Sequence, residues 1–259
     1  MESNLHRGTR ERHERLLTLI QSGHTSVHVL AKEFGVSSST VRRDLARLNE
    51  TGAITRTYGG ATSGMPFRER DLRERLTVEV QAKAAIGRVA ANLVPDRGII
   101  FVDAGSTCGQ LAKHLAGRAG LTVLTRGIEI AVQLAGSAEL ELVIIGGSVA
   151  RKSHGLVGPL AELALQRYTV DVAFLGVDAL DPVDGVGEPT LSEAYVKELA
   201  ALQARKVVVL ADATKLSRGT VPAWAPLPHG WTLITNERDQ TVLDRYRSCG
   251  VEVISTLSD

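Results

Sequence analysis

The sequence predicts an α/β protein in which a small helical N-terminal domain is joined to an open, mostly parallel α/β sheet domain. Residues 1–50 of the 259-residue chain show only helical periodicity. From Gly98 onward, short β-branched runs alternate with helical stretches. Such alternation is typical of a parallel sheet covered by helices on both faces.

Charge is distributed unevenly, although the whole chain has a formal net charge of only +1. Residues 1–63 hold nine Lys/Arg and six Asp/Glu, a net charge of +3, and the remainder of the chain has −2. The cationic surface therefore belongs to the N-terminal domain. The two cysteines, Cys108 and Cys249, are too few for a disulfide framework or a cysteine-rich zinc site.

No apolar run approaches the roughly 18 residues that a membrane span needs, and the N-terminal residues lack an apolar signal-peptide core. We expect a soluble, cytoplasmic protein with no membrane partner. His24 and His28 have a spacing that could hold a metal, but no third ligand is near them in the sequence. We therefore expect neither a metal site nor a cofactor.

Two helical segments open the N-terminal domain. Their apolar residues recur at helical spacing and give each segment one apolar face: Leu16, Leu17 and Ile20 in the first, and Leu30, Ala31 and Phe34 in the second. Gly23 suits the end of the first helix, and Thr25 or Ser26 can cap the second. Gly35 then permits a sharp turn.

A third helix follows this turn, with Ser37 as its cap and Val41, Leu45 and Leu48 pointing inward. The opposite face carries hydroxyls and arginines, namely Ser38, Ser39, Thr40, Arg42, Arg43 and Arg47. Two helices joined by a short turn, the second with such a face, are typical of a helix-turn-helix. Arginine can pair bidentately with guanine, and serine or threonine reaches base edges or phosphates.

The next residues, Ala53–Ala61, alternate in polarity and contain the Gly59-Gly60 pair. They predict a small hairpin, the wing of a winged helix-turn-helix, with Arg56 placed for a phosphate or the minor groove. The alternative is a three-helix protein-interaction module whose arginines form a solvated face.

A charged connector at residues 64–79 separates the winged helix-turn-helix (1–63) from the second domain (80–259). Seven nearly continuous apolar runs in the second domain are predicted strands, because parallel strands are buried on both faces. They are Ile99–Val102, Leu121–Leu124, Leu142–Ile145, Val170–Val177, Val207–Leu210, Trp231–Ile234 and Val251–Ile254. Helical patterns lie between them.

The segment after the first of these strands has the composition of an anion site. Gly105 lets backbone approach a ligand, Ser106 and Thr107 supply hydroxyls, and the following helix start supplies unpaired N–H donors. Together they favour a phosphate, although the same residues also serve as ordinary turn chemistry.

Other strand ends carry similar residues, and ligands of open α/β sheets collect at the carboxyl ends of strands. These residues are Arg126, Gly146, Gly147, Asp178 and Lys215. Our hypothesis is that Ser106 and Thr107 hold a phosphate and that Lys215 adds a positive charge. Asp103 and Asp178 would then accept hydrogen bonds from sugar hydroxyls.

Several of these motifs resemble one family of proteins. The motifs are Arg12-x3-Leu16-x3-Ile20, then after sixteen residues Ser37-x2-Thr40-Val41-Arg42-Arg43-Asp44-Leu45, and Arg56-x2-Gly59-Gly60-Ala61. They resemble the N-terminal signature of the DeoR family of bacterial transcriptional regulators, and the strand-end loops of the second domain are similar to that family too. The resemblance implies a winged helix-turn-helix before a sensor of phosphorylated sugars whose fold resembles ribose-5-phosphate isomerase.

Three positions raise separate questions. The family usually has Asn where this chain has Arg126, which could pair with a phosphate or carboxylate, fill the pocket or face solvent. Asp44 is expected to orient Arg43, Arg47 or the second helix through a salt bridge. Glu193 and Lys197, in a stretch that resembles the family's Glu-Ala-x-Val-Lys, favour an ion pair on a helix surface.

We therefore expect a transcriptional repressor of a sugar or carbohydrate operon, released by a phosphorylated sugar or related effector. Its partners would be double-stranded operator DNA, this effector and a second copy of the chain in a homodimer or homotetramer. One alternative is a sugar-phosphate isomerase-like enzyme, with Asp178, Asp181, Asp184 and Lys215 as acid–base candidates. Another is a DNA-binding activator. We expect the protein not to be an enzyme, because an isomerase needs no winged helix-turn-helix.

Overall fold

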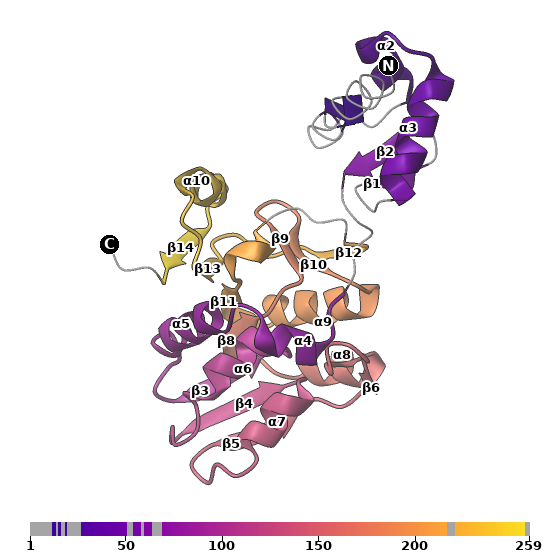
Figure 1. Cartoon of the computed structure of the whole chain (residues 1–259). Coiled ribbons are helices and arrows are strands. Elements are labelled where there is room, and N and C mark those ends of the chain that lie inside the picture. Colours follow the sequence, from indigo (N-terminus) through magenta and orange to yellow (C-terminus); the bar gives the residue numbers. More distant parts are fainter. Residues whose placement is uncertain are drawn as a thin grey trace. The chain divides into compact units, whose positions relative to one another are not determined.

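The computed structural model describes residues 12–13, 15–16, 19, 27–50, 54–57, 60–63, 69–216 and 221–256. The chain divides into two compact units, Met1–Arg68 and Glu69–Asp259 (Figure 1). The residues expected to end the first helix and cap the second, Gly23, Thr25 and Ser26, lie outside the described residues. None of the described helices combines the length and the apolarity that crossing a bilayer requires.

The N-terminal unit contains the predicted helix-turn-helix and hairpin. Helices α2 (Val27–Phe34) and α3 (Ser38–Glu50) are joined at Gly35, whose φ of +61° favours glycine. Strands β1 (Ile54–Thr57) and β2 (Gly60–Ser63) pair antiparallel. The core consists of buried apolar residues, among them Leu16, Leu30, Val41, Leu45 and Leu48. The apolar face predicted for the third helix is confirmed.

The second unit is built on a seven-stranded parallel sheet in the order β14-β13-β11-β8-β3-β4-β5. The strands are β3 (Gly98–Val102), β4 (Leu121–Thr125), β5 (Glu141–Ile144), β8 (Val170–Leu175), β11 (Ala204–Leu210), β13 (Thr232–Thr235) and β14 (Glu252–Ser255). Each of the seven predicted apolar runs overlaps one of them. The predicted α/β fold class is confirmed.

Helices cover both faces of this sheet (Figure 1). They are α5 (Val80–Ala91), α6 (Ser106–Ala112), α7 (Ile128–Leu134), α8 (Pro159–Leu165), α9 (Leu191–Leu202) and α10 (Gln240–Ser248). The short helix α4 (Leu72–Thr77) contacts α6. One core holds the inner residues of α5, α6 and α7 with one face of the strands. The other core holds those of α8, α9 and α10.

Short elements add to this frame and were not predicted. They are β9 (Ala179–Asp181), β10 (Gly185–Glu188) and β12 (Ala223–Ala225) in one antiparallel sheet, β6 (Ser148–Val149) with β7 (Leu156–Val157), and the 3₁₀ turn Ala213–Lys215. Segments of two to four residues are too short to establish a recognisable period.

Part of the predicted connector packs on the second unit. Residues 69–79, which we call the strap, belong to the second unit and contain α4. Leu72 is buried, and its backbone N–H donates to the carbonyl of Lys152 at 2.8 Å. Lys152 Nζ donates in return to the carbonyl of Glu69 at 3.0 Å. The single buried leucine and these bonds hold a charge-rich segment on the sheet domain.

Candidate functional site

Helix α3 presents the face expected of a recognition helix. Arg42, Arg43 and Arg47 are exposed, whereas Val41 and Leu45 on the other side are buried. The three guanidinium groups are therefore accessible to a nucleic-acid partner. Arg56 lies in β1 of the confirmed hairpin, but its side chain is outside what the structure describes.

The hydroxyl residues at the start of α3 form a local network. Ser37 Oγ accepts a hydrogen bond from the backbone N–H of Thr40 at 3.2 Å, so the predicted cap is confirmed. Ser37 Oγ also lies 2.7 Å from Ser39 Oγ and 2.9 Å from Thr40 Oγ1. Ser39 is exposed, and Ser38 and Thr40 are half-buried. The network orders the end of the helix that the sequence assigns to DNA.

Asp44 forms a salt bridge, but its partners are not the arginines of α3. Its carboxylate is buried and accepts from Arg12 Nε at 2.7 Å, and it lies 3.2 Å from His13 Nε2. Burial raises the pKa of Asp44, but the hydrogen bonds from Arg12 and His13 outweigh it and hold that pKa below its ordinary value. Asp44 thus joins α3 to the segment before α2.

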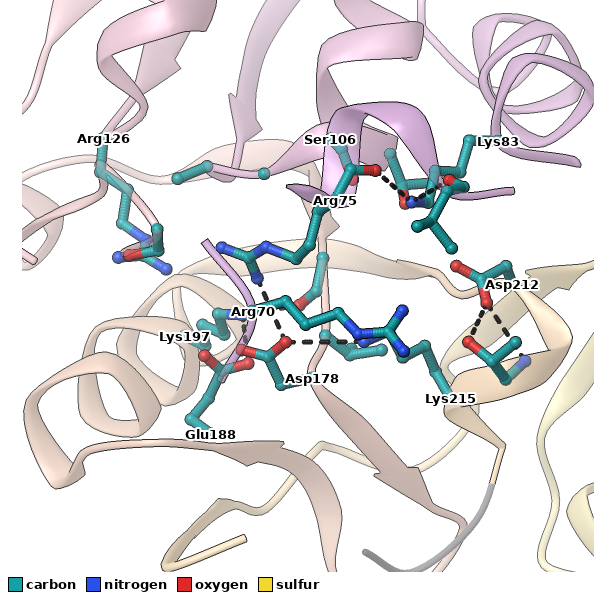
Figure 2. Close-up of a pocket in the computed structure, with 18 residues that line it drawn as sticks. Arg70, Arg75, Lys83, Ser106, Arg126, Asp178, Glu188, Lys197, Asp212 and Lys215 are labelled. Atoms are coloured by element: carbon teal, nitrogen blue, oxygen red, sulfur yellow. Dashed lines mark hydrogen bonds and ion pairs between the residues drawn. The ribbon is translucent and has the colours of Figure 1, made fainter. Parts of the chain in front are cut away.

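A pocket lies in the second unit at the carboxyl ends of the central strands (Figure 2). Its walls come from the segments that follow β3, β4, β8 and β11, from α5, α6, α9 and β10, and from the strap. Six Lys/Arg against three Asp/Glu line it. The charged lining residues are Arg70, Arg75, Lys83, Arg126, Lys197, Lys215, Asp178, Glu188 and Asp212. The excess of positive charge favours an anionic ligand.

Six of the nine predicted effector residues line this pocket: Gly105, Ser106, Thr107, Arg126, Asp178 and Lys215. They arrive from four different strand ends, as the rule for open α/β sheets requires. The chain order reverses between β3 and β8, because β4 and β5 lie on one side of β3 and the later strands on the other. The pocket occupies this switch point.

Asp103 is a correction, since it does not line the pocket. It is fully buried, and its Oδ1 accepts from Arg126 Nε at 2.5 Å and from the N–H of Ala104 at 2.8 Å. Its Oδ2 accepts from the N–H of Gly176 at 3.2 Å and lies 3.2 Å from Lys197 Nζ. With both oxygens occupied, Asp103 positions two cations that line the pocket, Arg126 and Lys197, and is not available for a sugar hydroxyl.

Gly146 and Gly147 are also corrections. They follow β5, the edge strand, two strands away from the switch point, and neither lines the pocket. Gly147 has a φ of +144°, and a Cβ there would lie 2.4 Å from the carbonyl oxygen of Val157. The glycine therefore serves the close approach of β6 to β7.

Sequence reasoning missed the cations that the strap and α5 contribute. Arg75 Nη1 donates to Asp178 Oδ1 at 3.1 Å, and Lys215 Nζ lies 3.6 Å from the same oxygen (Figure 2). Lys83 Nζ donates to the carbonyls of Arg75 and Val78 at 2.7 and 2.6 Å. Burial lowers the pKa of Lys83. The one feature of the sequence that could have indicated this contribution is Lys83, because it lies within the mostly apolar pattern of α5.

Glu193 and Lys197 do not form the expected surface pair, because both are buried. Ser153 Oγ donates to Glu193 at 2.6 Å. Lys197 Nζ donates to the carbonyl of Gly176 at 2.7 Å and to Glu188. Burial raises the pKa of Glu188 to about 8, and the nearby Lys197 offsets only part of this. The two residues occupy the inner face of α9.

Comparison with known families decides the affiliation. Residues 78–237 match the DeoR C terminal sensor domain, and residues 12–66 match the DeoR-like helix-turn-helix domain. The chain belongs to the DeoR family. The resemblance drawn from the sequence is thereby confirmed, and the protein is a transcriptional regulator with a DNA-binding domain and a sensor domain.

Two relatives match this DeoR-family chain over nearly its whole length. This chain is 32% identical to the HTH-type transcriptional regulator GlpR of Haloferax volcanii, and the match covers 94% of this chain and 96% of GlpR. It is 28% identical to the HTH-type transcriptional repressor CsqR of Escherichia coli, covering 96% of each. Ribose 5 phosphate isomerase A of Neisseria gonorrhoeae shares 16% identity over 54% of each chain, with a TM-score of 0.40.

Proposed function

We propose that this DeoR-family protein represses a carbohydrate operon and releases its operator when a phosphorylated sugar or related metabolite binds the pocket. The observation that carries the proposal is the cationic lining beside Ser106 and Thr107 at the switch point of the sheet. Repression is favoured over activation because the relative CsqR is named a repressor. The cationic face of α3 supplies the contact with double-stranded operator DNA.

The phosphate would lie against Ser106 and Thr107. Their hydroxyls and the N–H groups of the first turn of α6 are donors, and the first N–H groups of a helix have no intrahelical partner. Lys215 and Arg75 would add charge-assisted hydrogen bonds. Asp178, which already pairs with both cations, would exchange part of this pairing for a sugar hydroxyl.

Binding would have to move the strap. The pocket leaves only about 40 Å³ of space, whereas each buried water needs about 10–15 Å³ on that measure. A sugar phosphate is larger than the few waters that fit, so we infer that Arg70 or Arg75 moves when it binds. In the sequence, the strap is the part of the second unit that comes directly after the N-terminal unit. A coupling of about 1–3 kcal/mol through it would change operator affinity roughly 5- to 150-fold.

Calorimetry with phosphorylated and unphosphorylated forms of the same sugars tests the phosphate site. We expect binding of the phosphorylated forms only, and we expect Ser106→Ala with Thr107→Ala to abolish both this binding and the release of DNA, while operator affinity is retained. Equal affinity for the two forms of a sugar would refute the role of phosphate.

We propose that the protein is not an enzyme. Asp181 and Asp184 do not line the pocket, and Asp181 pairs with Arg245 outside it. Of the acid–base candidates, only Asp178 and Lys215 lie in the pocket, and they pair with one another. Turnover of pentose or hexose phosphates by the purified chain would contradict the proposal.

We also infer that two or more copies assemble through the second unit. Helices α8 and α9 pack together and expose apolar side chains, namely Leu160, Leu163, Leu191 and Leu202. A dimer would place two recognition helices on half-sites about 34–36 Å apart. In sedimentation equilibrium, Leu160→Glu with Leu191→Glu should yield monomers, and Val183→Glu, a change at another exposed apolar residue, should not.

A further inference from the structure

Arg126 is an unusual residue for the interior of a protein, because it is charged and is among the largest fully buried side chains of the described residues. Its Nε donates to Asp103, but its Nη1 is buried and has no hydrogen-bond partner among those residues. A Cβ at Gly155 would lie 2.3 Å from Nη1. The chain is thus shaped around a guanidinium whose hydrogen-bonding capacity is not filled, which is costly in a buried site.

Arg126 shares its counter-charge with a second buried cation. Two cations, Arg126 and Lys197, share the single carboxylate of Asp103, and Lys197 also contacts Glu188. Burial raises the pKa of Glu188, so its negative charge is held less firmly than that of an ordinary glutamate. Glu193, the other buried acid that acts on Arg126, accepts a hydrogen bond from Ser153. An anionic group from outside the chain would fill the free hydrogen-bonding capacity of the guanidinium.

The Arg126 guanidinium lies at a defined end of the pocket. Figure 2 shows Arg126 and Lys215 on opposite sides of the pocket, with Asp178 between them. Ser153 also lines the pocket, and its hydroxyl donates to Glu193 and accepts from the N–H of Gly155. The phosphate proposed above is assigned to the side of Ser106 and Lys215, so the Arg126 side would receive a different group of the same ligand.

We propose that the Arg126 side of the pocket binds a carboxylate, so that the effector is a phosphorylated sugar acid and not a neutral sugar phosphate. This inference rests on the proposed function, because it uses the phosphate site to orient the ligand. A carboxylate is planar and matches the fork of a guanidinium. It is also smaller than a second phosphate, which suits the limited space in the pocket.

Matched ligand pairs test the proposal on the unaltered full-length chain. Each pair is an aldonic acid phosphate and the aldose phosphate of equal length, such as 6-phosphogluconate with glucose 6-phosphate and 5-phosphoribonate with ribose 5-phosphate. One charge-assisted hydrogen bond corresponds to about a tenfold or greater difference in affinity. In the pair whose chain length fits the pocket, we expect calorimetry to show at least this preference for the acid. A sugar bisphosphate of the same length should bind more weakly than the acid.

Variants assign the preference to Arg126. Arg126→Gln should remove the preference for the acid, and Arg126→Lys should retain part of it, because charge remains without the fork. Arg167→Gln, a change at an exposed arginine outside the pocket, should leave the preference intact. Circular dichroism establishes that each variant is folded, and the wild-type comparison is decisive even where Arg126→Gln does not fold.

The outcomes separate the two proposals. If neutral aldose phosphates bind as well as the acids, or if bisphosphates bind more tightly, the carboxylate site is refuted while the phosphate site stands. If no phosphorylated ligand in the panel binds and unphosphorylated acids do, the proposed function itself is wrong.

Discussion

Replacing Asp103 with alanine is expected to reduce the free energy of unfolding of the second unit by about 3–5 kcal/mol, because it leaves buried cations without their counter-charge. Asp103 is the shared partner of Arg126 and Lys197, and all three side chains are almost inaccessible to solvent. Typical domains have a total stability of only about 5–15 kcal/mol. One substitution would thus remove a large part of it.

Urea unfolding followed by tryptophan fluorescence measures this effect selectively. The two tryptophans of the chain, Trp224 and Trp231, both belong to the second unit, so the signal reports on that unit alone. Asp244→Ala is the matched control, because its ion pair with Arg247 is exposed and should contribute no more than about 0.5 kcal/mol. Equal loss in the two variants would contradict the role assigned to Asp103.

The pH dependence of stability offers a second view of the same carboxylate. Burial raises the pKa of Asp103, but Arg126 and Lys197 outweigh it and lower that pKa below its ordinary value. A carboxyl group with a lowered folded-state pKa stabilises the fold above its unfolded pKa, and this contribution is lost as the pH falls through the folded value. Asp103→Ala should therefore lose most stability near neutral pH and less in acid.

The sheet was predictable because its strands are buried on both faces. Runs such as Val170–Val177 and Val207–Leu210 are nearly continuously apolar, and they form the adjacent strands β8 and β11. The strand-end residues Ser106 and Lys215 were predictable for the same reason, since the position of a parallel strand determines where the residues after it lie. Local composition was sufficient for both.

The remainder of the site depends on contacts between distant parts of the chain. Arg75 meets Asp178 across 103 positions, and nothing in a charge-rich segment distinguishes an arginine that packs from one that is solvated. Asp103 follows a central strand as a ligand residue would, but its oxygens meet Arg126 and Lys197 from other strands and helices. Sequence spacing indicates which residues share an edge, not which of them neutralise each other.

The pair Glu193 and Lys197 illustrates this limit within a single helix. Their i, i+4 spacing places them on one face of α9, as expected. That face is buried, and each residue has a different partner: Glu193 accepts from Ser153, and Lys197 donates to Glu188. Periodicity identifies a common face, whereas burial depends on which element packs against it.

Replacing Arg42 and Arg43 together with alanine is expected to weaken operator binding about 100-fold while metabolite affinity is unchanged. Each bidentate base contact discriminates by about 1–3 kcal/mol, so two arginines at about 1.4 kcal/mol each give this factor. Both side chains are exposed on α3, and the packing of α3 depends instead on Val41, Leu45 and Asp44. The variant should therefore remain folded.

Gel shifts on the DNA upstream of the chain's own gene measure the loss, and the salt dependence identifies its cause. If the arginines contact phosphates, the slope of log K against log[salt] should fall by about 0.9 for each contact removed. If they read bases, the slope should change little and the loss should depend on sequence. Arg167→Ala with Arg205→Ala is the matched control, because it removes the same charge from exposed positions of the second unit. A comparable loss of operator binding in that control would mean that net charge, and not the face of α3, holds the duplex.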